Sequence, residues 1–124
     1  MRKTIVIDGK EVELKATAST LRRYRNWFNR DLLKDFSKLY RAYQAAQLQS
    51  AETGVPVELE LSGDAIEMIQ DLTYVMARQA DSSVPTNVDD WLDQFGTFEI
   101  EKTGQVIIEL WLSSLQSDGT LKNA

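Results

Sequence analysis

Residues 3–15 read KTIVIDGKEVELK, and this stretch decides the fold class. Two short β-prone runs flank Asp8-Gly9, a dipeptide that type I′ turns favour because both central residues need positive φ. The second run alternates polar and apolar residues, as a strand with one covered face does. An isolated hairpin is only marginally stable in water, so its apolar face must lie on another element. We therefore expect an N-terminal β-hairpin over residues 3–15 that packs on the rest of the chain.

Apolar residues recur at helical spacing after the hairpin, from about residue 20 onward. Ser19 or Thr20 is placed to cap a short aromatic helix, and Asn29 is expected to end or bend it. Asp31 suits the start of a second helix, because a helix N-terminus favours negative charge. This second helix is expected to run to about Leu48.

A polar stretch from residue 49 to 63 predicts a loop, with a short β-prone alternation at residues 57–61. A helix with one apolar side follows from Ser62-Gly63-Asp64 and ends at residues 81–83. A short helix starts at residues 85–87 and closes at Gly96, and a last helix begins near Thr97 or Phe98. The sequence thus predicts one mainly α domain with a small β-hairpin, an α+β helical bundle of four to five helices. We place this domain at residues 1–117 and a flexible C-terminal tail at residues 118–124.

The 124-residue chain contains no histidine and no cysteine. It therefore lacks the commonest general base, the commonest metal ligand, any thiolate nucleophile and any disulfide. Asp89 and Asp93 share a helix face and could hold a hard cation, but acids in the first turn of a helix are explained by its dipole. We expect neither an enzyme nor a metal or cofactor site.

The sequence also carries no targeting or membrane-spanning signal that we can identify. No apolar run approaches the roughly 18 to 20 residues of a membrane span. The apolar run near the N-terminus is too short for a signal peptide. We therefore expect a soluble cytoplasmic protein.

Charge is distributed unevenly along the chain, whose net charge is −5. Residues 20–44 hold seven basic and two acidic side chains, whereas residues 50–124 hold 14 acidic and three basic ones. The basic segment could dock on the acidic remainder within the fold, or it could form a surface for an acidic partner. Its interleaved aromatics also suit nucleic acid, although a net charge of −5 opposes binding to a phosphate backbone.

Two segments carry a resemblance to a known family: residues 24–35, YRNWFNRDLLKD, and residues 88–95, VDDWLDQF. Together with the Asp-Gly hairpin and the order of the helices, they resemble the tail assembly chaperones of long-tailed, siphovirus-type bacteriophages and prophages of Gram-positive bacteria. The likeness in order extends from about residue 3 to 116. Asn29 stands where many relatives have glycine, and asparagine also tolerates a left-handed bend.

This resemblance implies a protein-binding function without catalysis. Such chaperones hold the long tape measure protein in solution until tail tube subunits polymerise around it, and they are absent from the mature virion. The implied location is the cytoplasm of the bacterial host. Tape measure protein is the implied partner, tail tube protein is a second one through a frameshifted longer form, and self-association is expected.

A chaperone of this kind needs apolar surface that accepts amphipathic helices without strong side-chain readout. We expect the second helix and the last helix to supply it. The candidate partner-binding residues are Tyr40, Tyr43, Leu48, Trp111 and Leu115. Each of them could equally be a core residue. The alternative function is a small helical adaptor or regulatory protein that binds another cellular protein or, with less support, nucleic acid.

Overall fold

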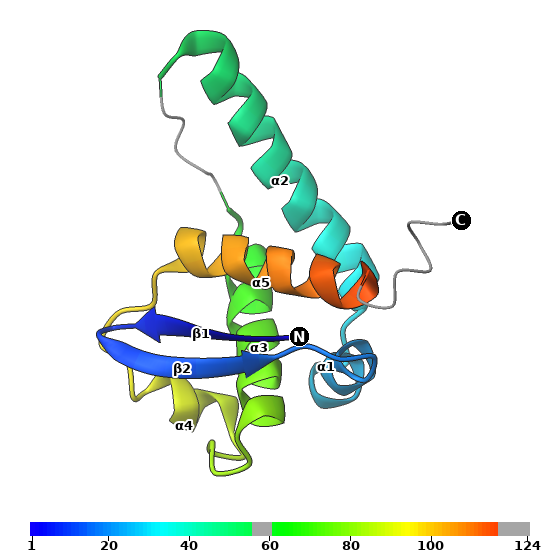
Figure 1. Cartoon of the computed structure of the whole chain (residues 1–124), viewed down its shortest axis with the longest axis vertical. Coiled ribbons are helices and arrows are strands. Elements are labelled where there is room, and N and C mark those ends of the chain that lie inside the picture. The colour runs from blue at the N-terminus through cyan, green and yellow to red at the C-terminus, as the bar shows by residue number, and fades with distance from the viewer. Residues whose placement is uncertain (56–60, 117–124) are drawn as a thin grey trace.

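Two strands and five helices make up the computed structural model, which describes residues 1–55 and 61–116 but not the side chains of Leu115 and Gln116. The chain is mainly α-helical with a small N-terminal β-hairpin (Figure 1). The elements are β1 (Arg2–Ile7), β2 (Lys10–Lys15), α1 (Thr20–Phe28), α2 (Leu32–Thr53), α3 (Gly63–Ala80), α4 (Val88–Leu92) and α5 (Ile100–Gln116).

The predicted hairpin is confirmed. β1 and β2 pair antiparallel, and the turn between them has positive φ at both Asp8 (50°) and Gly9 (74°), as a type I′ turn requires. Ile7 and Leu14 are fully buried on the face that meets the helices, and residues on the other face are exposed. The hairpin is therefore held in place by its apolar face, as the alternation in β2 indicated.

The helix boundaries near residue 30 follow local capping chemistry. Asn29 adopts a left-handed conformation with φ of 53° and ends α1. The Asp31 side chain accepts a hydrogen bond from the Lys34 backbone N–H at 3.3 Å and starts α2. Both predictions are confirmed. At α3, Ser62 plays the same capping role.

Three predicted helix boundaries are wrong by a few residues. The helix α2 continues to Thr53 instead of ending near Leu48, because alanine, glutamine and glutamate are good helix formers and no breaker occurs before Gly54. The helix α4 ends at Leu92 instead of near Gly96, and α5 begins at Ile100 instead of near Thr97 or Phe98. The β-prone alternation at residues 57–61 lies outside the described residues except for Leu61, which belongs to no regular element. The predicted tail at residues 118–124 also lies outside them.

The centre of the fold is α3, on which β2, α1, α2, α4 and α5 all pack. In Figure 1 it runs behind the hairpin, and α5 crosses it. The sequence suggested one apolar side, but all seven residues from Asp71 to Ala77 are buried. A helical segment that is buried on every side belongs to the core. This position explains why threonine and aspartate occur in its middle: they face neighbouring elements instead of water.

The long helix α2 has two halves with different surroundings. Its proximal half, residues 32–43, packs on the core through Leu32, Phe36 and Leu39. Its distal half, residues 44–53, projects beyond α3 and α5 (Figure 1) and has only Ala46 and Ser50 half-buried. Within residues 1–55 and 61–116, no helix combines the length and the apolar character needed to cross a membrane.

Candidate partner-binding groove

A groove with a volume of about 520 Å³ lies between the proximal half of α2 and the N-terminal end of α3. Two local features set its walls. The left-handed Asn29 turns the chain between α1 and α2, and the Ser62 hydroxyl caps α3 by accepting a hydrogen bond from the Ala65 backbone N–H at 3.1 Å. Both termini were predictable from sequence, but their juxtaposition was not.

The floor of the groove is apolar. Leu39 and Met68 are almost fully buried beneath it, with 2% and 1% of their surfaces exposed. Ala42, Leu61 and Ala65 are half-buried and supply the accessible apolar surface. Such a floor accepts an aliphatic side chain without selecting one shape, because it presents methyl groups and no hydrogen-bonding pocket.

The rim of the groove carries charges of both signs. Lys34 and Lys38 lie one helical turn apart on α2, and Asp31, Asp35 and Asp64 complete the rim. Among the described residues, neither lysine forms an ion pair. Asp31, Asp35 and Asp64 form no ion pair among these residues either, so the rim can contact both acidic and basic groups of a partner.

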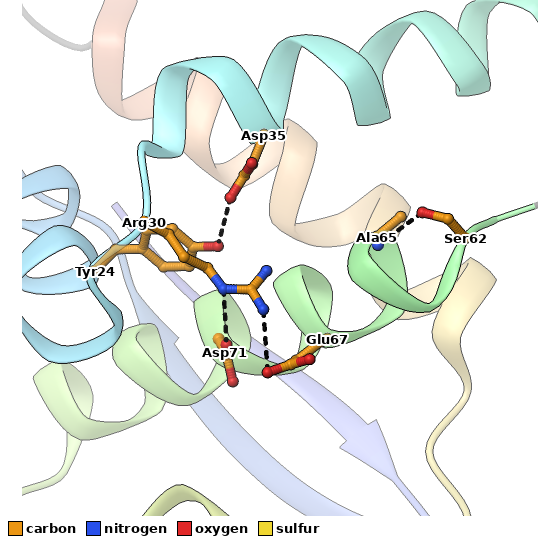
Figure 2. Close-up of polar contacts among 7 residues, drawn as sticks. All are labelled: Tyr24, Arg30, Asp35, Ser62, Ala65, Glu67 and Asp71. Carbon is orange, nitrogen blue, oxygen red and sulfur yellow. Dashed lines mark hydrogen bonds and ion pairs between the residues drawn. The ribbon is translucent and has the colours of Figure 1, made fainter.

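A polar cluster at one end of the groove joins α1, α2 and α3 (Figure 2). The Arg30 guanidinium lies between two carboxylates of α3, with its Nη2 3.0 Å from Glu67 Oε1 and its Nε 3.8 Å from Asp71 Oδ2. The Tyr24 hydroxyl donates to Asp35 Oδ2 at 3.2 Å. These contacts hold the junction between α1 and α2 against α3 and thereby fix the width of the groove.

Burial governs the electrostatics of this cluster. Asp71 is 5% exposed, and burial raises its pKa from 3.8 to about 7, although the nearby Arg30 acts in the opposite direction. Burial and the negative charge of Asp35 likewise raise the pKa of Tyr24. Asp71 also lines a pocket of about 490 Å³ together with Glu67 and Asp89. We assign Asp71 and Tyr24 a scaffold role because their contacts with Arg30 and Asp35 join α1, α2 and α3. Within the described part of the chain, no three acidic side chains converge to hold a metal ion.

The basic segment at residues 20–44 packs on the acidic part of the fold, since α1 and α2 both contact α3, but it makes few ion pairs with the described residues there. Among its seven basic side chains, only Arg30 forms an ion pair with any acidic residue that the structure describes. The exposed ones are Arg22, Arg23, Arg25, Lys34, Lys38 and Arg41. Arg30 agrees with docking inside the fold, and the six exposed basic side chains leave a surface for an acidic partner open as the other explanation.

The candidate partner-binding residues whose side chains are described differ in exposure. Leu48 is 63% exposed on the distal half of α2, whereas Trp111 is 3% exposed and packs edge-on against Phe36 with ring centroids 6.3 Å apart. The position of Trp111 therefore agrees with the core interpretation that the sequence left open. Leu115 lies in α5, but its side chain is outside the described set.

The two candidate tyrosines are half-buried where the halves of α2 meet. Tyr40 stacks on Phe36 with ring centroids 6.1 Å apart. The Tyr43 hydroxyl donates to the Glu101 backbone carbonyl at 2.6 Å, and burial raises the pKa of Tyr43 to about 12. A β-carbon at position 104 would overlap this hydroxyl, so Gly104 is needed for α5 to approach α2 this closely. Both tyrosines anchor α2 and leave only part of each ring for a partner.

The groove itself was missed by the sequence interpretation. Its residues come from two segments, 30–42 and 61–68, and no spacing rule connects Lys38 with Ala65, which follows it by 27 positions. The available signal was the run of basic residues without nearby acids, which indicated that α2 carries uncompensated charge.

Comparisons with protein-family models, with curated proteins and with solved structures gave no significant match to this chain. The resemblance to tail assembly chaperones therefore depends on the two motifs at residues 24–35 and 88–95 and on the order of the elements.

Proposed function

We propose that this protein is a phage tail assembly chaperone that binds the tape measure protein and keeps it soluble until the tail tube polymerises. The motif order supports this proposal, and so does a composition without histidine or cysteine, which is typical of a binding protein more than of an enzyme. We further propose that the protein acts in the cytoplasm of the bacterial host, associates with itself and is absent from the mature virion. Contact with tail tube protein through a longer form is also part of the proposal.

The distal half of α2 is the observation that carries the proposal. Ten residues continue the helix beyond the core, and eight of them are exposed. Helix ends that gain nothing from packing are usually short, because propensity alone contributes little stability. A projecting helix of this length agrees with a surface that is completed by another protein.

The composition of the distal half suits a partner with many different sequences. It reads QAAQLQSAET, with Glu52 as the single charge and Leu48 as the one large apolar side chain. Alanine and glutamine let a second helix approach closely without demanding particular charges from it. The groove beside the proximal half then adds a second, mixed-charge contact. Each contact contributes a modest affinity, so tight overall binding comes from many copies bound along one tape measure chain. Each copy can still dissociate.

Co-expression with the neighbouring tape measure protein tests the proposal directly. We expect a soluble complex that co-purifies, and aggregation of the tape measure protein when it is expressed alone. A tape measure protein that is soluble unaided and forms no complex would overturn the proposal. The chain would then be an adaptor for a different protein. The gene neighbourhood provides an independent check, because a tail chaperone gene lies between the tail tube gene and a very long tape measure gene.

A matched pair of variants locates the contact. Leu48→Asp places a charge on the distal half of α2 and is expected to weaken tape measure binding by at least about tenfold. Leu33→Asp introduces the same change on the proximal half, at a side chain that is 55% exposed and outside the groove. It should leave binding within about threefold of the wild type. Equal binding by both variants in a pull-down titration would show that the distal half is not the contact.

A further inference from the structure

A second pocket, with a volume of about 430 Å³, lies near the other end of α3 and opens between α1 and residues 86–88. Trp27 and Phe28 of α1 form one side, and Tyr74 and Arg78 of α3 form the other. We call it the Trp27 pocket. Arg78 follows the groove residue Ala65 by 13 positions on α3, which corresponds to about 20 Å along the helix axis. The two sites therefore do not share residues.

Trp27 is the exposed aromatic residue in this pocket. Its exposed fraction is 42%, whereas Trp91 and Trp111 are 2% and 3% exposed. The indole packs against Tyr74 with ring centroids 6.1 Å apart, so it is held in position instead of moving freely. A large aromatic side chain that is fixed and still faces water is typical of the anchoring residues in protein interfaces.

Two arginines lie beside the Trp27 pocket. The Arg23 guanidinium lies over the Trp27 ring, 5.9 Å from its centroid. Arg78 lines the opposite side, where its Nη1 donates to the carbonyls of Ser82 at 2.8 Å and Val84 at 2.6 Å. Among the residues that the structure describes, no aspartate or glutamate lines the pocket itself, although the chain as a whole carries a net charge of −5. The pocket is thus an aromatic hollow between two fixed cations.

We infer that the Trp27 pocket binds an acidic peptide segment of a partner protein, with one large apolar side chain against Trp27 and Phe28 and flanking carboxylates at Arg23 and Arg78. This inference does not depend on the proposed function, because it concerns different residues and a different ligand. Arginine pairs well with carboxylates, and its planar group can do so while it stacks on an aromatic ring.

A peptide fits this surface better than nucleic acid does. A phosphate backbone requires a line of cations, whereas the Trp27 pocket has two around an apolar hollow. Asp89 and Asp90 follow directly after the pocket residue Val88 and are exposed. They would repel a continuous polyanion, but a short peptide need not reach them.

A shift in tryptophan emission provides the assay, because Trp27 is exposed to the ligand, whereas the other two tryptophans are buried and should keep their emission. The probes are short synthetic peptides in which the glutamates and a central leucine are varied independently, together with an oligothymidine strand. We expect the peptide with both features to shift the emission in a titration. Peptides without the leucine, or with lysines in place of the glutamates, should bind at least about tenfold more weakly.

Two variants with the same charge change test the position of the site. Arg23→Glu should weaken binding of the acidic peptide by at least about tenfold. Arg25→Glu lies on the same helix but about 160° around its axis from Arg23, and should leave binding nearly unchanged. Circular dichroism confirms that both variants fold, and Arg23→Gln provides a milder change at the same position. The inference is overturned if no acidic peptide binds, if both glutamate variants lose binding equally, or if the oligothymidine strand binds more tightly than every peptide.

Discussion

The helix α3 and the distal half of α2 have the same secondary structure but different sources of stability. In α3 seven consecutive residues are buried, and every other helix and β2 pack on it. In the distal half of α2 most side chains face water, and helix-forming composition favours the helical backbone there. The difference separates a helix that determines the fold from one that is available to a partner.

This contrast also explains the residue types of the two helices. The buried positions of α3 are mostly large and apolar, such as Leu72 and Met76, because burial of apolar area is the dominant favourable term in folding. The distal half of α2 has alanine and glutamine, which keep a helix formed and soluble without a partner. Substitutions in α3 should therefore lower the free energy of unfolding strongly. Substitutions in the distal half of α2 should change it little and affect partner binding instead.

The largest expected effect comes from a matched leucine pair. Leu72→Ala removes a fully buried side chain of α3 and should lower the free energy of unfolding by about 2–5 kcal/mol, because it leaves a cavity. Leu48→Ala on the distal half of α2 should change it by less than about 0.5 kcal/mol, because the side chain is already in water. Urea denaturation followed by circular dichroism measures both. Similar losses for the two variants would mean that the distal half packs on the core in solution.

A second expected effect arises from the carboxyl group buried in α3. Because the pKa of Asp71 is raised to about 7 in the folded state, the folded protein holds a proton that the unfolded chain has lost between about pH 4 and pH 7. Its contribution to the free energy of unfolding should therefore fall as the pH rises through this window, by on the order of 2–4 kcal/mol.

Two variants isolate this contribution in denaturation curves at a series of pH values. Asp71→Asn should remove most of the slope, since asparagine does not titrate. Glu67→Gln changes the exposed partner of the same arginine and should keep most of it. If the wild type and Asp71→Asn have the same pH profile, the buried carboxyl is not the group responsible.

The smallest expected effect lies where the two halves of α2 meet. Gly104→Ala places a methyl group against the Tyr43 hydroxyl and 3.0 Å from Ile69 Cδ1. We expect a loss of about 1–2 kcal/mol in the free energy of unfolding, because overpacking outweighs the better helix propensity of alanine. Tyr43→Phe removes the hydroxyl and should recover part of this loss in the double variant. Fully additive losses in this double-mutant cycle would contradict a direct contact between the two positions.

Much of the local structure followed from short sequence signals. Asp8-Gly9 predicted the hairpin turn, Asn29 the end of α1, and Asp31 and Ser62 the starts of α2 and α3, and the structure agrees with each. The end of α2 was missed because no residue between Leu48 and Gly54 breaks a helix, although the sequence there becomes polar. The polar composition predicted a loop, but the high helix propensity of these residues continues the helix.

The candidate site was less predictable than the fold. Leu48 was identified and is exposed, but Trp111 was grouped with it and is buried. Both are large apolar residues at helical spacing, and spacing does not tell which apolar face has a partner within the fold. The groove beside Lys34 and Lys38 and the Trp27 pocket are each formed by residues from different elements.

The sequence by itself determined the hairpin, the order of the helices, most of their starts and the uneven charge. These features depend on backbone dihedrals and on contacts between residues that are at most a few positions apart. The tertiary structure alone decided that residues 71–77 of α3 are buried on every side, that the distal half of α2 is not, and that Arg30 pairs with Glu67 and Asp71. Burial and ion pairing of this kind depend on which distant segments come together, because the free energy of a side chain is set by all of its neighbours and not by its own element.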